Sequence, residues 1–263
     1  MRIGYILAVG VFAVPQVVFA QDREPDILYV TGTVQSGAGI GGNGGEIEWL
    51  RTMSPRASVI AGGAVSSISD LWWTYGTFGG FVRRRDVTYS GRVSLGSGRW
   101  HNDTFLYGRY LGAATIPVAG GFHVDAGVQH VRIASITAIV LQLGTTYRAS
   151  RGVGVGLAYH AAPWDPALGG ALSARGDVNL HGVTVMGGMV ATARPITPAN
   201  VQALDLTTRV APEFFVGCSM PAGHSRVIAS AQVVPQPSGR IVRLLVTLKH
   251  PTGGGGGRGE SDR

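Results

Sequence analysis

The sequence predicts an all-β protein, specifically a transmembrane antiparallel β-barrel, and three observations support this prediction. Apolar and polar residues alternate with a period of two in many segments between residues 27 and 250, whereas a helical period is almost absent. These segments are close to the about 9–11 residues that a tilted strand needs to cross a bilayer. Aromatic residues gather near the segment ends, as they do in the interfacial girdles of membrane barrels.

The chain begins with the features of a secretory signal peptide. Arg2 precedes a stretch that is apolar through Phe19 apart from Gln16, and the stretch ends in Val18-Phe19-Ala20, a small-x-Ala cleavage pattern. We therefore expect cleavage after Ala20 and exclude residues 1–20 from the fold. We find no second apolar run of membrane-helix length, which argues against a helical inner-membrane protein.

The alternation is clearest in Gly152–His160, where Val153, Val155, Leu157 and Tyr159 share one face. Turn-forming Gly, Pro, Asn and Asp residues separate the alternating segments. Up to 14 segments resemble strands, some of them weakly, and bacterial barrels have an even number of strands. Allowing for false positives, we expect about 12 strands within residues 21–250, with 10 and 14 open. The same alternation occurs in Val87–Leu95, Phe122–Gln129, Leu172–Leu180, Leu204–Val210 and Ile241–Lys249.

A soluble β-sandwich remains the alternative fold, because alternation alone does not say whether the apolar face meets lipid or a core. The aromatic residues near segment ends favour the barrel, since they suit a girdle at each membrane interface. The girdle candidates are Trp72, Trp73, Trp100, Tyr107, Tyr110, Tyr147, Tyr159 and Trp164.

Two further features bound the fold. Cys218 is the only cysteine, so the chain has no intrachain disulfide, and we interpret Cys218 as a small apolar residue. Residues 251–263 contain the run Gly253–Gly257 and have no apolar residue to bury after Pro251, so we expect a disordered tail.

The charge points to anionic partners. The formal net charge is +7, and Lys249 is the only lysine among the basic residues. Secretion argues against nucleic acid as the partner. We expect contacts with outer-membrane lipid and lipopolysaccharide, and with a polysaccharide or a small anionic solute.

By strand parity, the polar faces would line the lumen of the barrel. Opposite charges paired across a narrow lumen would fill it, which is the arrangement that we expect, because an unpaired arginine at low dielectric is costly. An open anion-attracting pore is the alternative. The lumen-lining candidates are Arg92, His123, Asp125, Arg175, Asp177, Asp205, Arg209 and Arg243.

Several short motifs carry no chemistry in our interpretation. Gly37–Gly42 matches a dinucleotide-binding fingerprint, but no helix follows it, so we expect a glycine-rich turn or loop and no cofactor. His123 and Asp125 share a face, and we interpret them as a structural pair because no nucleophile is identifiable. Arg83–Arg85 is expected in a solvated turn, and no residue spacing suggests a metal site.

One region of the chain resembles a known family. Gly120-Gly121-Phe122 followed by Ala126-Gly127, then Ile139–Tyr147 and Gly152–Pro163, is similar to consecutive strands of the YaiO family of outer-membrane β-barrels. The resemblance implies a single barrel of about a dozen strands, in a family some of whose members resemble parts of polysaccharide-export systems. The chain departs from the family pattern at His130 and in a last strand without a terminal aromatic residue.

Taken together, the sequence predicts a non-enzymatic outer-membrane barrel that is structural or passes a small or polymeric anionic solute. An outer-membrane enzyme acting on lipid or lipopolysaccharide is the first alternative. A soluble periplasmic β-sandwich that binds a ligand is the second.

Overall fold

The protein forms one closed ring of 14 antiparallel strands. The computed structural model describes residues 26–37, 39–133, 136–149, 152–161, 170–192, 213–236 and 239–252. None of the described residues forms a helix long and apolar enough to span a bilayer. The strands are β1 (Ile27–Gly37), β2 (Ile40–Ser54), β3 (Ala57–Ile68), β4 (Leu71–Arg84), β5 (Val87–Trp100), β6 (Asp103–Ala119), β7 (Phe122–Ile133), β8 (Ile136–Ala149), β9 (Val153–Ala161), β10 (Gly170–Leu180), β11 (Val183–Thr192), β12 (Glu213–Ala222), β13 (Ser225–Gln236) and β14 (Gly239–Pro251).

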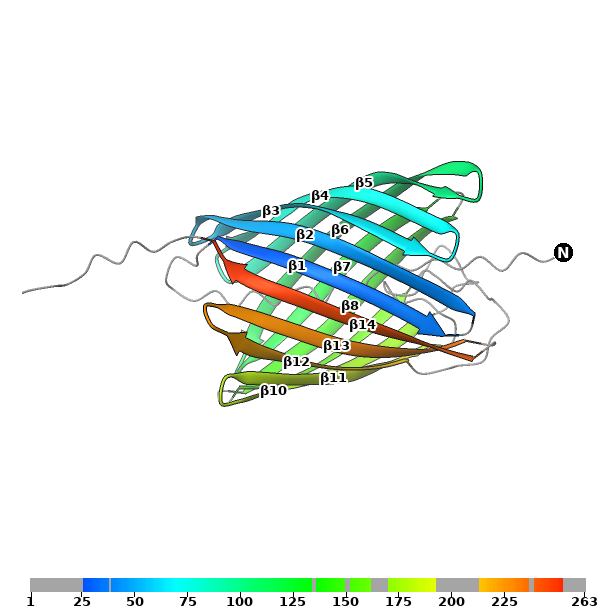
Figure 1. Cartoon of the computed structure of the whole chain (residues 1–263). Coiled ribbons are helices and arrows are strands. Elements are labelled where there is room, and N and C mark those ends of the chain that lie inside the picture. Colours follow the sequence, from blue (N-terminus) through cyan, green and yellow to red (C-terminus); the bar gives the residue numbers. More distant parts are fainter. Residues whose placement is uncertain are drawn as a thin grey trace, which may run out of the picture.

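Each strand pairs with its neighbours in the chain, and β1 pairs with β14 to close the barrel (Figure 1). At this seam the register runs from Ile27 opposite Pro251 to Ser36 opposite Val242. The hydroxyl groups of Thr31 and Thr247 lie 2.9 Å apart across the seam. Closure leaves no strand edge unpaired, which is the condition for a sheet to sit in lipid.

The expected count of about 12 strands was wrong, and the structure has 14, one of the values left open. The sequence contains up to 14 strand-like segments, and the lower expectation discounted some of them as false positives. Glycines that we expected in a loop are part of a strand, because Gly41–Gly45 lie in β2 and pair with β1. The expected segment Leu204–Val210 lies outside the described residues.

The two ends of the barrel differ. Ile27 and Pro251 lie at the same end, which we call the termini end, and the turn between β6 and β7 there is Gly120-Gly121, with φ of 56° and 86°. The opposite end, which we call the loop end, carries the two longest connections of the chain, residues 162–169 and 193–212. Long connections are typical of the extracellular side of bacterial barrels.

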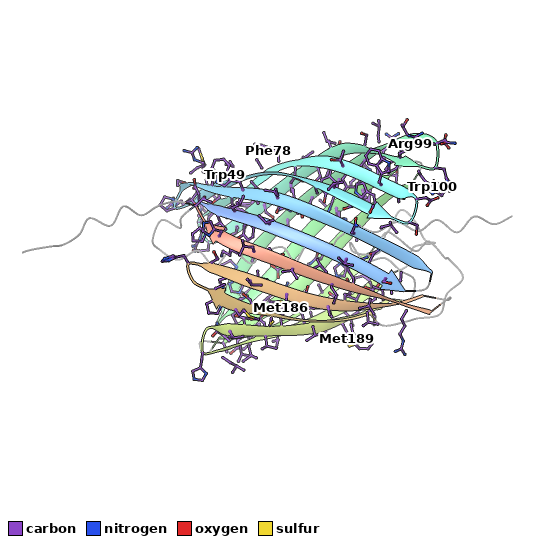
Figure 2. The ribbon with its side chains drawn as sticks, viewed as in Figure 1. Trp49, Phe78, Arg99, Trp100, Met186 and Met189 are labelled. Atoms are coloured by element: carbon purple, nitrogen blue, oxygen red, sulfur yellow. The ribbon has the colours of Figure 1, made fainter. Side chains whose placement is uncertain are left out.

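The outer surface of the barrel is apolar (Figure 2). Side chains that point away from the lumen stay exposed, for example Phe78, which is 65% exposed, and Leu106, which is 67% exposed. Many of their neighbours along the strands point inward and are buried, including polar residues such as Thr77. This distribution is the reverse of a soluble protein and is the one that lipid contact requires.

The girdle candidates divide between the two faces. Trp72 is 47% exposed on the outer face, whereas the adjacent Trp73 is 2% exposed and points into the lumen. Adjacent strand residues face opposite sides, so both could not belong to the girdle. On the outer face lie Trp72, Tyr110, Tyr147 and Tyr159.

The assignment of Trp73, Trp100 and Tyr107 to the girdle was therefore wrong, because their parity places them inside. Tyr107 and Trp73 are buried in a cluster within the lumen, and Trp100 packs against that cluster. Trp164 lies outside the described residues. Outer aromatic residues that were not among the girdle candidates are Trp49, Tyr89, Phe122 and Phe214.

Candidate functional site in the lumen

The lumen contains an apolar cluster near the loop end, which we call the loop-end cluster. Its buried members come from β3, β4, β6 and β7 on one side and from β13 and β14 on the other, so the cluster reaches across the lumen. Tyr75 and Trp100 pack against it. The members are Ile68, Leu71, Trp73, Phe105, Tyr107, Val131, Val234 and Ile241.

Aromatic rings in the loop-end cluster lie over glycines of the inner wall. A Cβ atom on Gly98 of β5 would meet the Phe105 ring and the Cβ atom of Trp73, at 2.6 Å from the latter. The rings of Tyr75 and Tyr107 lie 4.9 Å apart between centroids. The rings therefore occupy the space that inward glycine positions leave free.

A charged and polar layer lies between this cluster and the termini end. Glu48 of β2 and Arg92 of β5 form a two-point ion pair, with Nη1 2.9 Å from Oε1 and Nη2 donating to Oε2 at 3.3 Å. Both side chains are largely buried, at 12% and 14% exposed. Glu46, two residues before Glu48 on the same face, is buried beside this pair.

Each partner of the ion pair lies beside a glycine on one of the two strands between them. Gly62 of β3 lies opposite Glu48, and Gly79 of β4 lies opposite Arg92. A Cβ atom on Gly62 would be 2.9 Å from Glu48 Cγ, and one on Gly79 would be 3.2 Å from Arg92 Cβ. Two inward glycines thus make room for the pair.

A second polar chain continues around the seam of the barrel. Arg243 of β14 donates through Nε to Gln35 Oε1 at 3.2 Å and through Nη1 to Gln232 Oε1 at 3.3 Å. Gln232 donates through Nε2 to Glu213 Oε2 at 3.0 Å. This chain links β1, β14, β13 and β12, so the inner polar groups are bound to one another rather than exposed.

Polar contacts also line the side formed by β4–β7. Arg109 Nη2 donates to Gln129 Oε1 at 3.3 Å, and the hydroxyl groups of Thr77 and Ser94 lie 2.9 Å apart.

A second apolar cluster closes the β1–β4 side at the termini end. It contains Ile27, Leu50, Ile60 and Phe81, with Tyr29 packed against it. Much of the lumen beside β1–β7 is therefore filled with packed side chains.

The wall formed by β8, β9 and β10 is different. Its inward positions include small residues such as Gly144, Gly156 and Ala158. Gln142 and Arg175 also point inward on this wall, yet both remain exposed. An inward side chain that stays exposed has solvent-accessible space beside it, so the described residues do not fill the lumen along this wall.

The sequence-predicted lumen candidates occupy different places. Arg92 and Arg243 lie in the polar layer with the partners described above. Arg175 donates through Nη2 to Thr146 Oγ1 at 3.3 Å, and within the described ranges it forms no ion pair. Asp177 lies against Gly154, since a Cβ atom on Gly154 would be 2.5 Å from Asp177 Oδ1. Asp205 and Arg209 lie outside the described residues.

His123 and Asp125 both lie on the inner face of β7, but the hydrogen bonds of Asp125 go elsewhere. Its carboxylate accepts from Thr115 Oγ1 at 2.7 Å and from Thr146 Oγ1 at 2.8 Å. These bonds fix Asp125 between β6 and β8, which is a structural arrangement.

Two further histidines, His101 and His160, also have local partners. His101 Nδ1 lies 2.6 Å from an oxygen of Asp70 in the neighbouring turn, and His160 Nε2 lies 3.0 Å from Ser173 Oγ. Among the described residues, no group of three or more His, Cys, Asp or Glu side chains is placed to hold a metal ion.

The sequence analysis missed most of the polar layer. Glu46 and Glu48 alternate with the outward residues Ile47 and Trp49, and this pattern in the sequence was sufficient to place both glutamates inside. Other inward polar residues that were missed are Gln35, Arg109, Glu213 and Gln232.

Comparisons with known proteins bear on the fold. No family model matches the chain, and no curated protein matches its sequence, so the YaiO resemblance stays a prediction. The CymD monoaromatic hydrocarbon channel is 8% identical and superposes with a TM-score of 0.63 over 94% of this chain and 94% of that chain. The toluene transporter TodX of P. putida is 8% identical and superposes with a TM-score of 0.62 over 88% of this chain and 91% of that chain.

A triple mutant of the Rhodopseudomonas blastica porin is 10% identical and covers 85% of this chain and 99% of its own, with a TM-score of 0.47. This TM-score is too low to carry an argument. At such low sequence identities, the likeness to CymD and TodX establishes a shared barrel fold and does not establish a shared solute.

Proposed function

We propose that this protein is an outer-membrane channel that passes small hydrophilic solutes, with a preference for anions, along the wall formed by β8, β9 and β10. The exposed apolar outer face supports insertion in a membrane, and the likeness to the CymD and TodX barrels supports a channel over an enzyme. The long connections at the loop end favour an orientation with that end outside the cell.

The observation that carries this proposal is the exposure of inward-facing Arg175 and Gln142. Their accessible side chains mark a path that the packed layers on the other side of the lumen do not fill. Arg175 has no ion-pair partner among the described residues, so its charge acts on passing ions. Arg148 lies near the termini end of the same wall and adds a second positive charge.

The solute is small in this proposal because the loop-end cluster crosses the lumen and leaves less room for a polymer. This argues against polysaccharide export, which the YaiO resemblance would suggest. A second candidate solute is a small aromatic hydrocarbon, which the names of the CymD and TodX proteins suggest and which the rings of Trp73, Tyr75, Phe105 and Tyr107 would suit. The close burial of these rings favours the hydrophilic path.

Single-channel recording of the refolded protein in a planar bilayer tests the proposal. We expect small, discrete current steps, and in a salt gradient a reversal potential that indicates faster passage of anions than of cations. Protein denatured by heat before addition is the matched control and should give no steps. A refolded barrel that stays closed at every applied potential would contradict the channel, and uptake of toluene by liposomes without ion current would favour the hydrocarbon.

A further inference from the structure

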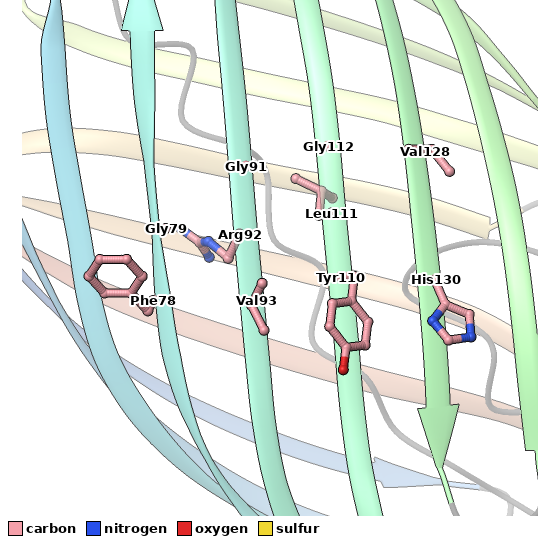
Figure 3. A pocket seen from close by; sticks show the side chains of 10 residues that line it. All are labelled: Phe78, Gly79, Gly91, Arg92, Val93, Tyr110, Leu111, Gly112, Val128 and His130. Atoms are coloured by element: carbon pink, nitrogen blue, oxygen red, sulfur yellow. The ribbon is translucent and has the colours of Figure 1, made fainter.

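Three glycines lie side by side on the outer face of the barrel. In the strand register, Gly80 of β4 lies opposite Gly91 of β5, and Gly91 lies opposite Gly112 of β6. The next outward row toward the loop end consists of large side chains, Phe78, Val93, Tyr110 and His130, which Figure 3 shows side by side. A depression of about 360 Å³ lies between these rows, where Gly91 and Gly112 line it, with Val128 at its β7 end. We call it the outer groove.

The packing of the wall does not require two of these glycines. A Cβ atom on Gly91 would have its nearest contact at 3.9 Å, with Leu111 O, and one on Gly112 at 3.7 Å, with Val128 Cγ1. Both are ordinary contacts. By contrast, a Cβ atom on the inward Gly79 would overlap the carbonyl oxygen of Gly91. The missing side chains therefore leave free volume on a surface that is otherwise covered by large apolar residues.

The outer groove rises toward the loop end as it crosses from β4 to β7. Phe78 lies seven residues from Leu71, where β4 begins at the loop end, whereas His130 lies three residues from Ile133, where β7 ends there. A chain molecule in the groove would therefore run from the middle of the wall toward the rim. Strand tilt produces this slope in a closed barrel.

Basic side chains lie at the rim above the groove. His130 stacks on Tyr110 with centroids 5.6 Å apart, and Arg132 follows it on the outer face of β7. Arg99 is exposed near the loop end of β5, as Figure 2 shows. Within the described part of the chain, neither Arg99 nor Arg132 forms an ion pair. Two guanidinium groups on separate strands thus lie beyond an apolar groove.

We propose that the outer groove binds one acyl chain of lipopolysaccharide and that Arg132 and Arg99 bind the phosphates of its lipid A headgroup. Lipid A carries two phosphates and several acyl chains, whereas common phospholipids carry one phosphate, so two separated arginines fit lipid A better. Guanidinium groups bind phosphate through paired charge-assisted hydrogen bonds. The inference rests on the orientation in the proposed function, which places the loop end at the lipopolysaccharide leaflet.

Titration of the detergent-solubilised full-length barrel with lipids, followed by native mass spectrometry, tests this site. We expect diphosphoryl lipid A to bind about tenfold more tightly than monophosphoryl lipid A. We expect R99Q/R132Q to remove this difference in affinity. We expect Gly112→Leu to weaken the binding of diphosphoryl lipid A about tenfold, because the leucine fills the groove. Gly32→Leu is the matched control, since Gly32 is an outward glycine of β1 with nothing within 4 Å of its Cβ position. It should bind like the unaltered protein.

Equal binding of phosphatidylethanolamine and diphosphoryl lipid A would overturn the proposal, as would equal affinities of Gly112→Leu and Gly32→Leu. Heat-modifiable migration on gels confirms that each variant is folded. Bilayer recording keeps the two proposals separate: Gly112→Leu should keep the ion current of the unaltered protein. A barrel that binds lipid A as expected but carries no current would contradict the channel and leave the lipid site standing.

Discussion

Glu48 and Arg92 form an ion pair across two intervening strands, with Nη1 2.9 Å from Oε1, and they meet above Gly62 and Gly79. The pair lies in the polar layer that narrows the lumen. It holds β2 and β5 together through side chains, in addition to the backbone ladders of the strands between them. This relationship shows how the inner face is organised: charges are paired where glycines leave room.

Removing one partner of this pair should destabilise the barrel. Arg92→Met leaves the Glu48 carboxylate largely buried without its cation, so we expect a loss of about 3 kcal/mol in the free energy of unfolding. The double variant E48M/R92M should lose less than Arg92→Met alone, because no uncompensated charge remains. Urea titrations in lipid vesicles measure both. Equal losses in the single and double variants would show that the two charges are not coupled.

Side chains introduced at the inward glycines should also destabilise the barrel. Gly79→Val places atoms against the Gly91 carbonyl oxygen and against Arg92 Cβ, where even a Cβ atom would be 3.2 Å away. We expect a loss of about 1–3 kcal/mol, as for overpacking of a dense core. Gly32→Val is the control, since nothing lies within 4 Å of a Cβ atom there. Unfolding titrations should separate the two variants, and an unchanged Gly79→Val would contradict the packing described.

The exposed charge of Arg175 should set the ion preference of the channel. Arg175→Glu replaces a positive charge on the open path with a negative one, so we expect the reversal potential in a salt gradient to shift toward cation preference. Arg99→Glu makes the same charge change on the outer face and should leave the reversal potential nearly unchanged. If both variants shift it equally, the path does not run along the wall formed by β8, β9 and β10.

The loop-end cluster should restrict the current. Phe105→Ala removes a ring that lies over Gly98 and should leave a cavity, with a loss of about 3 kcal/mol in the free energy of unfolding. We expect a higher single-channel conductance at the same time, because the cluster crosses the lumen. Leu106→Ala, the adjacent outward residue, is the control for loss of an apolar side chain. Lower stability without a change in conductance would place the path outside the cluster.

The sequence predicted the fold class through its period-two alternation, because a strand with one face in lipid must carry apolar residues at every second position. The register between strands was not predicted, because the turns that join the strands set it and their exact positions were not assigned. The pairing of Glu48 with Arg92 depends on that register. The strand count was underestimated because some of the 14 strand-like segments were discounted as false positives, whereas the structure has 14 strands.

The predicted aromatic girdle was only partly correct. Trp72 and Trp73 are adjacent, so alternation alone excludes one of them from the outer face, and composition near strand ends is a weaker guide than parity. The inner glutamates could have been found by the same rule. By contrast, the open path beside Arg175 depends on which bulky side chains fill the rest of the lumen, and only the three-dimensional structure shows this.

The assignment of lipid to the outer face and a packed polar lumen to the inner face can be tested with these adjacent tryptophans. Two variants, each retaining only Trp72 or only Trp73, are refolded into vesicles whose acyl chains carry bromine, which quenches tryptophan fluorescence on contact. Because Trp72 is 47% exposed outward and Trp73 is 2% exposed inward, we expect strong quenching of Trp72 and little quenching of Trp73. Equal quenching of both, or stronger quenching of Trp73, would contradict the account.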